Sequence, residues 1–203
     1  MKADEALRHF EETEALLSGH FKLSSGLHSD KYLQCAKVLQ WPDRAGALGA
    51  ALGAALAGLG IDAVVSPAMG GLIIGHEVGR ALGRRAIFTE RVEGAFVFRR
   101  GLGLEPGEKV VVVEDVVTTG GSTREVLALV RELGAVPVAC AAVVDRRGAS
   151  AGGGTELLEG LPFRAVLRME VPTWAAADCP FCKLGQEIVS PGSRRLSAVR
   201  PAG

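Results

Sequence analysis

Two adjacent carboxylates stand at the end of an apolar run and are followed by small hydroxyl side chains and glycines. The segment 110–125 reads VVVVEDVVTTGGSTRE, with Glu114 and Asp115 as the acidic pair. An unbroken run of valines predicts a strand that is covered on both faces, as in a parallel sheet. Ser122 and Glu125 have the spacing of a capping box, which predicts that Ser122 is the N-cap of a helix. The segment therefore predicts a strand, a loop of small residues and a helix.

The loop after the acidic pair has the composition of an anion-binding site. Ligands of open α/β sheets bind beyond the carboxyl ends of strands, and free N–H groups at a helix N-terminus favour phosphate. Backbone N–H groups and the hydroxyls of Thr118, Thr119, Ser122 and Thr123 are suited to hold one phosphate group. The loop is neither a Walker A sequence nor a GxGxxG sequence. Carboxylates repel phosphate, so the acidic pair suits sugar hydroxyls or a divalent cation, and a sugar phosphate carrying a metal satisfies both halves.

The same segment resembles the signature of the type I phosphoribosyltransferase family, which binds phosphoribosyl pyrophosphate (PRPP). The shared pattern is an apolar run, two acids, two apolar residues, Thr, a small residue, Gly, a small residue and Ser or Thr. The resemblance implies that the acids hold ribose hydroxyls and that the loop holds the 5′-phosphate. The implied PRPP-binding residues are Glu114, Asp115, Val116, Val117, Thr118, Thr119, Gly120, Gly121 and Ser122. From the residues alone, the alternative is a strand end followed by an ordinary turn.

Two further stretches resemble the branch of the family that uses orotate, a pyrimidine with one carboxylate. Asp145 and Arg146 follow the apolar run 138–144, so Arg146 is expected over the carboxyl edge of the sheet. A guanidinium grips a carboxylate with two parallel hydrogen bonds, and the resemblance implies that Arg146 binds orotate and that Thr118 reaches the same base. A solvated or salt-bridged Arg is the alternative. Residues 19–29, GHFKLSSGLHS, resemble the N-terminal hood that covers the base.

A second candidate anion site lies in residues 64–83, VVSPAMGGLIIGHEVGRALG, which run from a strand through a glycine-containing loop into a helix. This stretch resembles the pyrophosphate loop of the family. The backbone N–H groups that would bind belong to Ala68, Met69, Gly70 and Gly71. Gly70 stands where many orotate enzymes carry Lys, so this loop lacks a cationic contact. A plain turn before a helix is the alternative.

The segment 88–101, FTERVEGAFVFRRG, matches the mobile basic loop of the resembled enzymes, which closes over the pyrophosphate of a neighbouring subunit. Arg91 stands near the start of the basic cluster, whereas the later Lys and His of that cluster are absent. Arg91 is therefore the first candidate for the catalytic loop residue. Arg99 and Arg100 are the other candidates, or they merely cap a hairpin. A loop that crosses between subunits implies a homodimer.

The resemblance spans residues 16–182 and implies transfer of the phosphoribosyl group from PRPP to orotate, giving orotidine 5′-monophosphate and pyrophosphate in pyrimidine biosynthesis. The implied cofactor is Mg²⁺, carried mainly by PRPP and without a direct protein ligand. One alternative is a phosphoribosyltransferase for another base, which the hood and Arg146 oppose. Another is a non-catalytic PRPP-sensing regulator, which the depleted basic loop favours. Such a regulator needs a nucleic-acid surface, and the formal net charge of +0 opposes one.

The chain contains 4 Cys residues. Cys35 and Cys140 stand singly in apolar surroundings and are expected to be buried and inert. Cys179 and Cys182 form a lone CxxC, which is half of a zinc site. Because no second pair and no His lies near it in the sequence, metal binding is a minority interpretation beside a redox pair and a packed turn. No metal ligand is therefore assigned.

These residues need a scaffold, and the alternation of strand and helix patterns predicts an α/β fold. A central, mainly parallel sheet flanked by helices is expected, as in type I phosphoribosyltransferases, with a small hood from the N-terminal and C-terminal parts. Helices are predicted at 2–17, 42–59, 72–82 and from Ser122 to a stop at Gly134. Strands are predicted at 61–65, 86–88, 138–144, 163–169 and in the valine run. Residues 18–40 are expected to form a hairpin, and residues 89–107 an irregular segment.

The length of 203 residues suits one domain with its own core. A single domain is expected at 1–189, with a hood built largely from 18–40 and the C-terminal part, and residues 190–203 are expected to be a disordered tail. No apolar run is long enough to span a bilayer, and the acidic N-terminus is unlike a signal peptide. A cytoplasmic protein that binds neither nucleic acid nor membrane is therefore expected.

Overall fold

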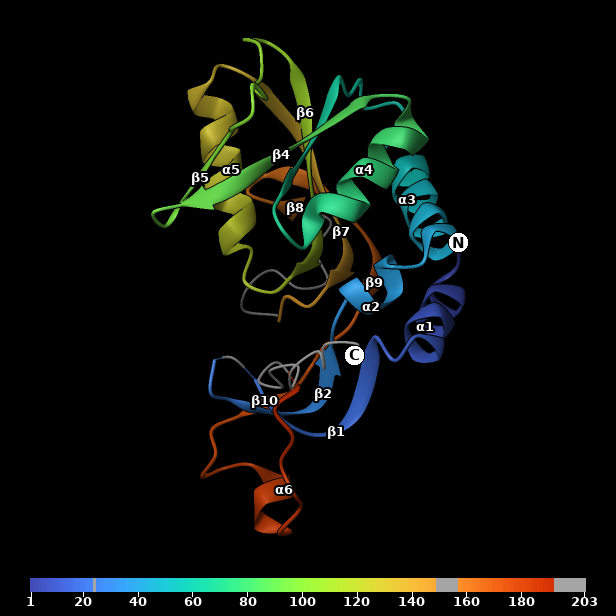
Figure 1. The fold of residues 1–203 in the computed structure, drawn as a ribbon, viewed down its shortest axis with the longest axis vertical. Helices are drawn as coiled ribbons and strands as arrows, with labels where there is room; N and C mark the ends of the chain where they lie inside the picture. Colours follow the sequence, from blue (N-terminus) through green and yellow to red (C-terminus); the bar gives the residue numbers. More distant parts are fainter. Residues whose placement is uncertain (24, 149–156, 192–203) are drawn as a thin grey trace, which may run out of the picture.

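The structure is a computed structural model that describes residues 1–23, 25–148 and 157–191. Its larger sheet contains seven strands among these residues (Figure 1). They are β3 (Ala63–Pro67), β4 (Arg85–Val92), β5 (Ala95–Val97), β6 (Lys109–Val117), β7 (Val136–Asp145), β8 (Leu157–Leu158) and β9 (Leu161–Arg168). Their order is β5-β4-β3-β6-β7-β9-β8. The five central strands, β4, β3, β6, β7 and β9, pair in parallel. The short strands β5 and β8 pair antiparallel at the two edges.

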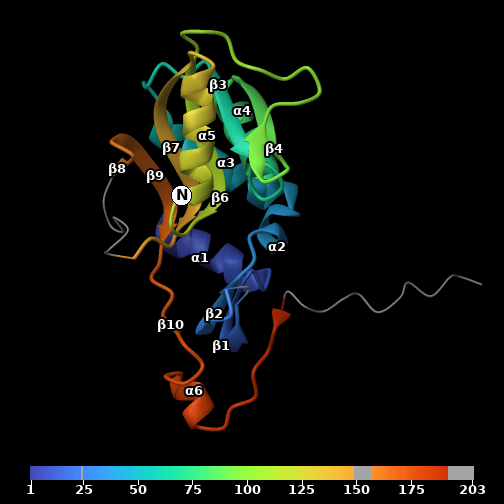
Figure 2. The same ribbon diagram turned by 90° about the vertical axis from the view of Figure 1, so that its left-hand side faces the viewer.

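Helices cover both faces of this sheet, with α3 and α4 on one face and α5 on the other (Figures 1 and 2). The helices are α1 (Ala3–Glu12), α2 (Ala36–Leu39), α3 (Pro42–Leu56), α4 (Gly71–Leu82), α5 (Gly121–Glu132) and α6 (Pro180–Lys183). The valine run of β6 is buried on both sides: Val111 and Val113 face one core cluster, whereas Val110 and Val112 face the other. The predicted α/β fold with a mainly parallel, doubly covered sheet is therefore confirmed.

A second, smaller sheet lies on the side of the larger sheet where β6 passes into α5 (Figure 1). Its strands are β1 (Leu16–Lys22), β2 (His28–Leu33) and β10 (Thr173–Trp174), in the order β1-β2-β10 with antiparallel pairing. The expected hairpin in residues 18–40 is present as β1 and β2. The strand predicted at 163–169 is present as β9, and a further short strand, β10, follows it and completes the small sheet.

The first helix ends earlier than its apolar pattern predicts. It stops at Glu12, and Leu16 and Leu17 belong to β1. Thr13 caps the helix end by donating its hydroxyl to the His9 carbonyl at 2.7 Å, and Glu14 adopts a positive φ of 52°. The apolar residues after this reversal therefore continue as a strand, which periodicity over so short a run does not distinguish from a helix.

The segment 89–107 is more regular than its polar sequence indicates. β4 extends to Val92 and pairs with β5 across a two-residue turn. The turn residues Glu93 and Gly94 have φ values of 51° and 90°. Two positive φ angles are the signature of the tight turn that matches the twist of a hairpin. The expectation of an irregular segment is therefore wrong for its first half.

Residues 149–156 and 192–203, which include most of the predicted tail, lie outside the described residues. The helix of the phosphate loop ends as predicted, with Leu133 as its C-cap and Gly134 at a φ of 78°. None of the helices in the described part of the chain is both long and apolar enough to cross a membrane.

Candidate active site

The candidate residues of three segments meet at the carboxyl ends of neighbouring strands, here called the binding edge of the larger sheet. β3, β6 and β7 are parallel neighbours, so their carboxyl ends lie side by side there. Val117 pairs with Asp145, and the backbone N–H of Arg146 donates to the Val117 carbonyl at 2.8 Å. The structure therefore brings together the acidic pair, the loop after it, the loop after β3 and Arg146.

The acidic pair is largely buried and has no ion-pair partner among the residues that the structure describes. Burial raises the pKa of Glu114 to about 8, and the neighbouring charge of Asp115 adds to this rise. Burial also raises the pKa of Asp115, opposed by the hydrogen bond that its carboxylate accepts from the Val116 N–H at 2.9 Å. The raised pKa favours the protonated form of Glu114, and two closely spaced acids remain available to a ligand.

Gly70 lies directly against the acidic pair. A Cβ atom built on Gly70 would come within 2.6 Å of Asp115 Oδ1 and 2.9 Å of Asp115 Oδ2. Its φ of −58° is an ordinary helical value, so space and not backbone conformation requires glycine here. The peptide bond between Ala68 and Met69 in the same loop is cis. A side chain at Gly70, such as the Lys of many orotate enzymes, would therefore displace the carboxylate of Asp115.

The loop between β6 and α5 presents backbone N–H groups at a helix N-terminus. Gly120 is the N-cap in the left-handed conformation, with a φ of 80°, which glycine adopts without strain. The predicted cap at Ser122 is wrong: Ser122 lies inside the first turn, and no side chain caps the helix. Thr118 and Thr119 are exposed in the loop. Because no side chain occupies the cap, the first-turn N–H groups remain suited to an anion.

Arg146 and its neighbour Arg147 have different surroundings. Arg147 is 3 % exposed and grips Asp145 with two hydrogen bonds, Nε to Oδ1 and Nη2 to Oδ2, both 2.9 Å long. The Nε of Arg146 is also buried, yet it has no hydrogen-bond partner among the described residues. Burial lowers the pKa of Arg146. A buried guanidinium N–H without an acceptor costs free energy. A ligand carboxylate that accepts this hydrogen bond would remove the cost.

The three candidate loop arginines are engaged with acids of the protein. Arg91 Nη2 lies 3.0 Å from Oε2 of Glu125 on α5, and its guanidinium stacks 4.0 Å from the centre of the Phe96 ring. Arg99 and Arg100 both face Glu90, at 3.6 and 2.6 Å. Arg91 thus lies beside the N-terminal half of α5, whereas the other two brace the β4–β5 hairpin. Sequence reasoning missed the two glutamates because ion-pair partners across strands have no fixed spacing.

Comparison with known proteins decides the family. Residues 38–151, more than half of the chain, match the family model described as phosphoribosyl transferase domain. An orotate phosphoribosyltransferase from Pelotomaculum thermopropionicum is 50% identical over 196 residues, covering 97% of this chain and 100% of the relative. One from Sphingopyxis alaskensis is 53% identical over 201 residues, covering 98% and 100%. This chain belongs to the orotate phosphoribosyltransferase family.

Solved structures agree with the family and with the fold. The orotate phosphoribosyltransferase of Mycobacterium tuberculosis, crystallised with inorganic phosphate, superposes with a TM-score of 0.64 at 25% identity, covering 81% of this chain and 95% of that chain. The enzyme from Aeropyrum pernix superposes with a TM-score of 0.62 at 25% identity, covering 83% and 94%. The predicted family and fold class are both confirmed.

Of the four cysteines, Cys35 lies near the acidic pair. Cys35 is buried, and its Sγ approaches the backbone carbonyl of Asp115 at 3.9 Å. Cys140 is buried within β7. Burial raises the pKa of both thiols, which agrees with the expectation that they are inert. Cys179 and Cys182 lie beside the small sheet, next to His20 and His28.

Proposed function

We propose that this protein transfers the phosphoribosyl group of PRPP to orotate, producing orotidine 5′-monophosphate and pyrophosphate in pyrimidine biosynthesis. The observation that carries the proposal is one binding edge with two unpaired acids, an uncapped helix N-terminus and an unsatisfied Arg146. These are the complements of ribose hydroxyls, a phosphate and a carboxylate. Near-complete coverage by orotate phosphoribosyltransferases at about 50% identity supports the same assignment.

PRPP would lie across the carboxyl ends of the neighbouring strands β3 and β6. The carboxyls of Glu114 and Asp115 would bind the ribose hydroxyls, and the loop 118–122 would bind the 5′-phosphate through its N–H groups and hydroxyls. The loop 68–71 would bind the pyrophosphate through backbone N–H groups. The close approach of Gly70 to Asp115 supports this arrangement, because it places the loop 68–71 beside the acidic pair.

The residues fit a metal that arrives with the substrate. Glu114 and Asp115 are oxygen ligands of the kind that Mg²⁺ prefers, yet they do not form a group of three or more acidic or His ligands within the described chain. A pair of carboxyls suits a metal that keeps waters and substrate oxygens around it. When bound with PRPP, Mg²⁺ neutralises and orients the leaving pyrophosphate. Glu114 and Asp115 would anchor the ribose hydroxyls, directly or through waters of the metal.

The chemistry needs no nucleophilic side chain. The anomeric carbon loses its bond to the pyrophosphate oxygen, and the bonding electrons leave with pyrophosphate. It forms a bond to the orotate ring nitrogen, whose N–H proton passes to the departing pyrophosphate or to solvent. Arg146 would fix the orotate carboxylate through paired hydrogen bonds, and Thr118 would reach the same base. Catalysis then arises from positioning and charge stabilisation.

The β4–β5 hairpin would supply the remaining cation. Arg91 is the first candidate, because its partner Glu125 lies on α5, the helix that follows the candidate phosphate loop. To reach a pyrophosphate it would have to release this ion pair, which is exposed and therefore weak. The proposal includes a homodimer in which the hairpin reaches a neighbouring subunit. It also includes a cytoplasmic location and a single domain over 1–189 with a hood.

The test is consumption of orotate by the purified protein, followed by ultraviolet absorbance in the presence of PRPP and Mg²⁺. Uracil, hypoxanthine and adenine serve as parallel acceptors, and omission of PRPP is the blank. Turnover with orotate alone is the expected result. Turnover with another base would overturn the role of Arg146. Saturable PRPP binding without turnover on any base would replace the enzyme by a PRPP-sensing regulator.

A further inference from the structure

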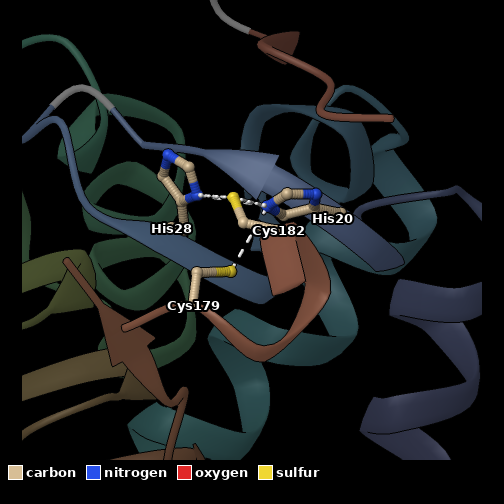
Figure 3. Close-up of side chains that lie close together, drawn as sticks. All are labelled: His20, His28, Cys179 and Cys182. Atoms are coloured by element: carbon tan, nitrogen blue, oxygen red, sulfur yellow. Dashed lines mark hydrogen bonds between the residues drawn. The ribbon is translucent and has the colours of Figure 1, made fainter. Parts of the chain in front are cut away.

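Two histidines and two cysteines from opposite ends of the chain meet beside the small sheet (Figure 3). His20 lies on β1 and His28 on β2, whereas Cys179 precedes α6 and Cys182 lies within it. One nitrogen or sulfur atom of each residue lies within 4.8 Å of the corresponding atoms of the others. The cluster plays no part in the proposed transfer reaction and lies outside the family match at 38–151.

The distances within the cluster are those of a tetrahedral metal site. Zinc–sulfur bonds of about 2.3 Å and zinc–nitrogen bonds of about 2.0–2.1 Å place nitrogens roughly 3.3 Å apart and nitrogen and sulfur roughly 3.6 Å apart. His20 Nε2 lies 3.1 Å from His28 Nδ1. The sulfur of Cys179 lies 3.4 Å from His20 Nε2, and that of Cys182 lies 3.6 Å from His20 Nε2 and 3.2 Å from His28 Nδ1.

The hydrogen bonding of His20 directs a lone pair into the cluster. Its Nδ1 lies 3.0 Å from the carbonyl oxygen of Gln186. A carbonyl only accepts, so this Nδ1 carries the proton, and in the neutral ring Nε2 is an acceptor. The three other potential metal ligands, His28 Nδ1 and the sulfurs of Cys179 and Cys182, surround that lone pair. A metal-ligating His usually donates its other ring nitrogen in this way, which fixes the tautomer and the orientation of the ring.

We propose that His20, His28, Cys179 and Cys182 bind one Zn²⁺ in a closed, structural Cys₂His₂ site. Two sulfurs and two imidazole nitrogens in a tetrahedron are the ligand set that favours zinc among the divalent metals. Binding would convert both thiols to thiolates and release their two protons to solvent. Two thiolates neutralise the charge of the ion, so a partly buried site carries no net charge.

The metal would join the ends of the chain across the small sheet. His20 and Cys179 are 159 positions apart. The strand β10 pairs with β2 close to the cluster, since Trp174 opposes His28. On the other side, the Val189 N–H donates to the His20 carbonyl at 2.8 Å. Zinc would cross-link residues 173–189 to the β1–β2 hairpin. This cross-link would stabilise the folded state, because closing so long a loop in the unfolded chain is entropically costly.

The first experiment measures metal content by elemental analysis of the full chain, purified without a histidine tag. About one zinc per chain is expected. Cys182→Ala and His28→Ala should each bind less than about a tenth of that amount, because three ligands leave the site open. The matched controls are Cys140→Ala and His76→Ala, which remove a Cys and a His outside the cluster and should keep the metal.

A second measurement keeps the test decisive if the variants fold poorly. The wild-type protein, stripped with a chelator under reducing conditions and refilled with Co²⁺, should show the visible bands of tetrahedral cobalt and a thiolate charge-transfer band. A folded wild-type protein that binds neither metal would overturn the proposal. So would a Cys179–Cys182 disulfide found by mass spectrometry in freshly purified protein, or zinc retained by both ligand variants.

Discussion

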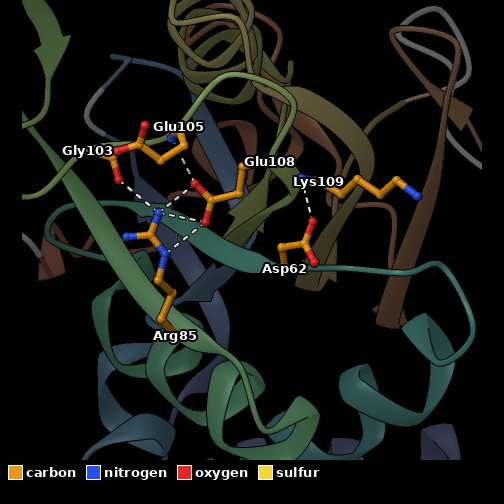
Figure 4. Close-up of polar contacts among 6 residues, drawn as sticks. All are labelled: Asp62, Arg85, Gly103, Glu105, Glu108 and Lys109. Atoms are coloured by element: carbon orange, nitrogen blue, oxygen red, sulfur yellow. Dashed lines mark hydrogen bonds and ion pairs between the residues drawn. The ribbon is translucent and has the colours of Figure 1, made fainter.

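The two ends of the larger sheet carry charged residues of the same types but in different states of pairing. At the amino end, Arg85 grips Glu108 with contacts of 2.6 to 2.8 Å, and Asp62 accepts the Lys109 backbone N–H at 2.9 Å (Figure 4). At the carboxyl end, Arg147 pairs with Asp145, but the acidic pair and Arg146 have no ion pair within the described residues. Charges that satisfy one another stabilise the fold, whereas charges left unpaired in a buried edge are available to a ligand.

The sharpest test of this contrast is Arg146→Ala. Loss of a charge-assisted pair with the orotate carboxylate, about 2–5 kcal/mol, should raise the orotate KM by roughly 30-fold or more. The PRPP KM should stay nearly unchanged, because the variant removes no PRPP contact. Steady-state kinetics with each substrate varied in turn measures both constants. An equal rise in both would mean that Arg146 holds the site together and does not bind orotate.

Asp115→Asn tests the sugar-binding role of the acidic pair. The amide keeps the size of the side chain but removes the charge, so each hydrogen bond from a ribose hydroxyl weakens. A loss of about 1.5–3 kcal/mol should lower the affinity for PRPP roughly 10- to 100-fold. Calorimetric titration with PRPP and Mg²⁺ measures it. Wild-type affinity in this variant would remove Asp115 from the site.

Glu114→Gln tests whether the raised pKa has a cost in stability. The folded state holds the Glu114 proton up to a pKa of about 8, whereas an exposed Glu loses it near about 4.3. Between these values the folded state binds more protons, so the free energy of unfolding falls as pH rises, by at most about 1.4 kcal/mol per pH unit. Gln removes this slope. Urea denaturation across the window measures it, and parallel pH profiles for both proteins would contradict the raised pKa.

Arg91→Ala tests the role of the hairpin. If the cation moves to the pyrophosphate in the transition state, kcat should fall about 10-fold, which corresponds to a loss of about 1.4 kcal/mol of transition-state stabilisation. Substrate affinities should change less, because the contact forms only on closure. Single-turnover and steady-state rates measure the effect. An unchanged kcat would transfer the role to Arg99 or Arg100.

The matched variant at the other end of the sheet is Arg85→Ala. Its ion pair with Glu108 is partly exposed, so its loss should cost only about 0.5–1 kcal/mol of unfolding free energy. Both KM values and kcat should remain those of the wild type, because Arg85 lies at the opposite end of the strands from the binding edge. A large change in either KM would break the division between a stabilising end and a binding end.

Local patterns predicted the parts of the fold that depend on near neighbours in the sequence. The valine run placed β6 in the interior, and Gly134 placed the end of α5. The prediction failed where a longer context decides the outcome. Ser122 has the spacing of a cap, yet Gly120 takes the cap because the loop needs a left-handed residue to leave β6. The sequence indicates Arg91 as a loop residue but does not indicate its partner Glu125.

The sequence by itself determined the alternation of strands and helices, the composition of the phosphate loop and the position of the acidic pair, because these follow from residue types at short spacing. Only the tertiary structure decided that Arg147 occupies Asp145 and so leaves Arg146 unpaired. Only the tertiary structure placed His20 and His28 beside Cys179 and Cys182. Contacts between distant segments depend on how sheets and helices pack, and no spacing along the chain encodes that proximity directly.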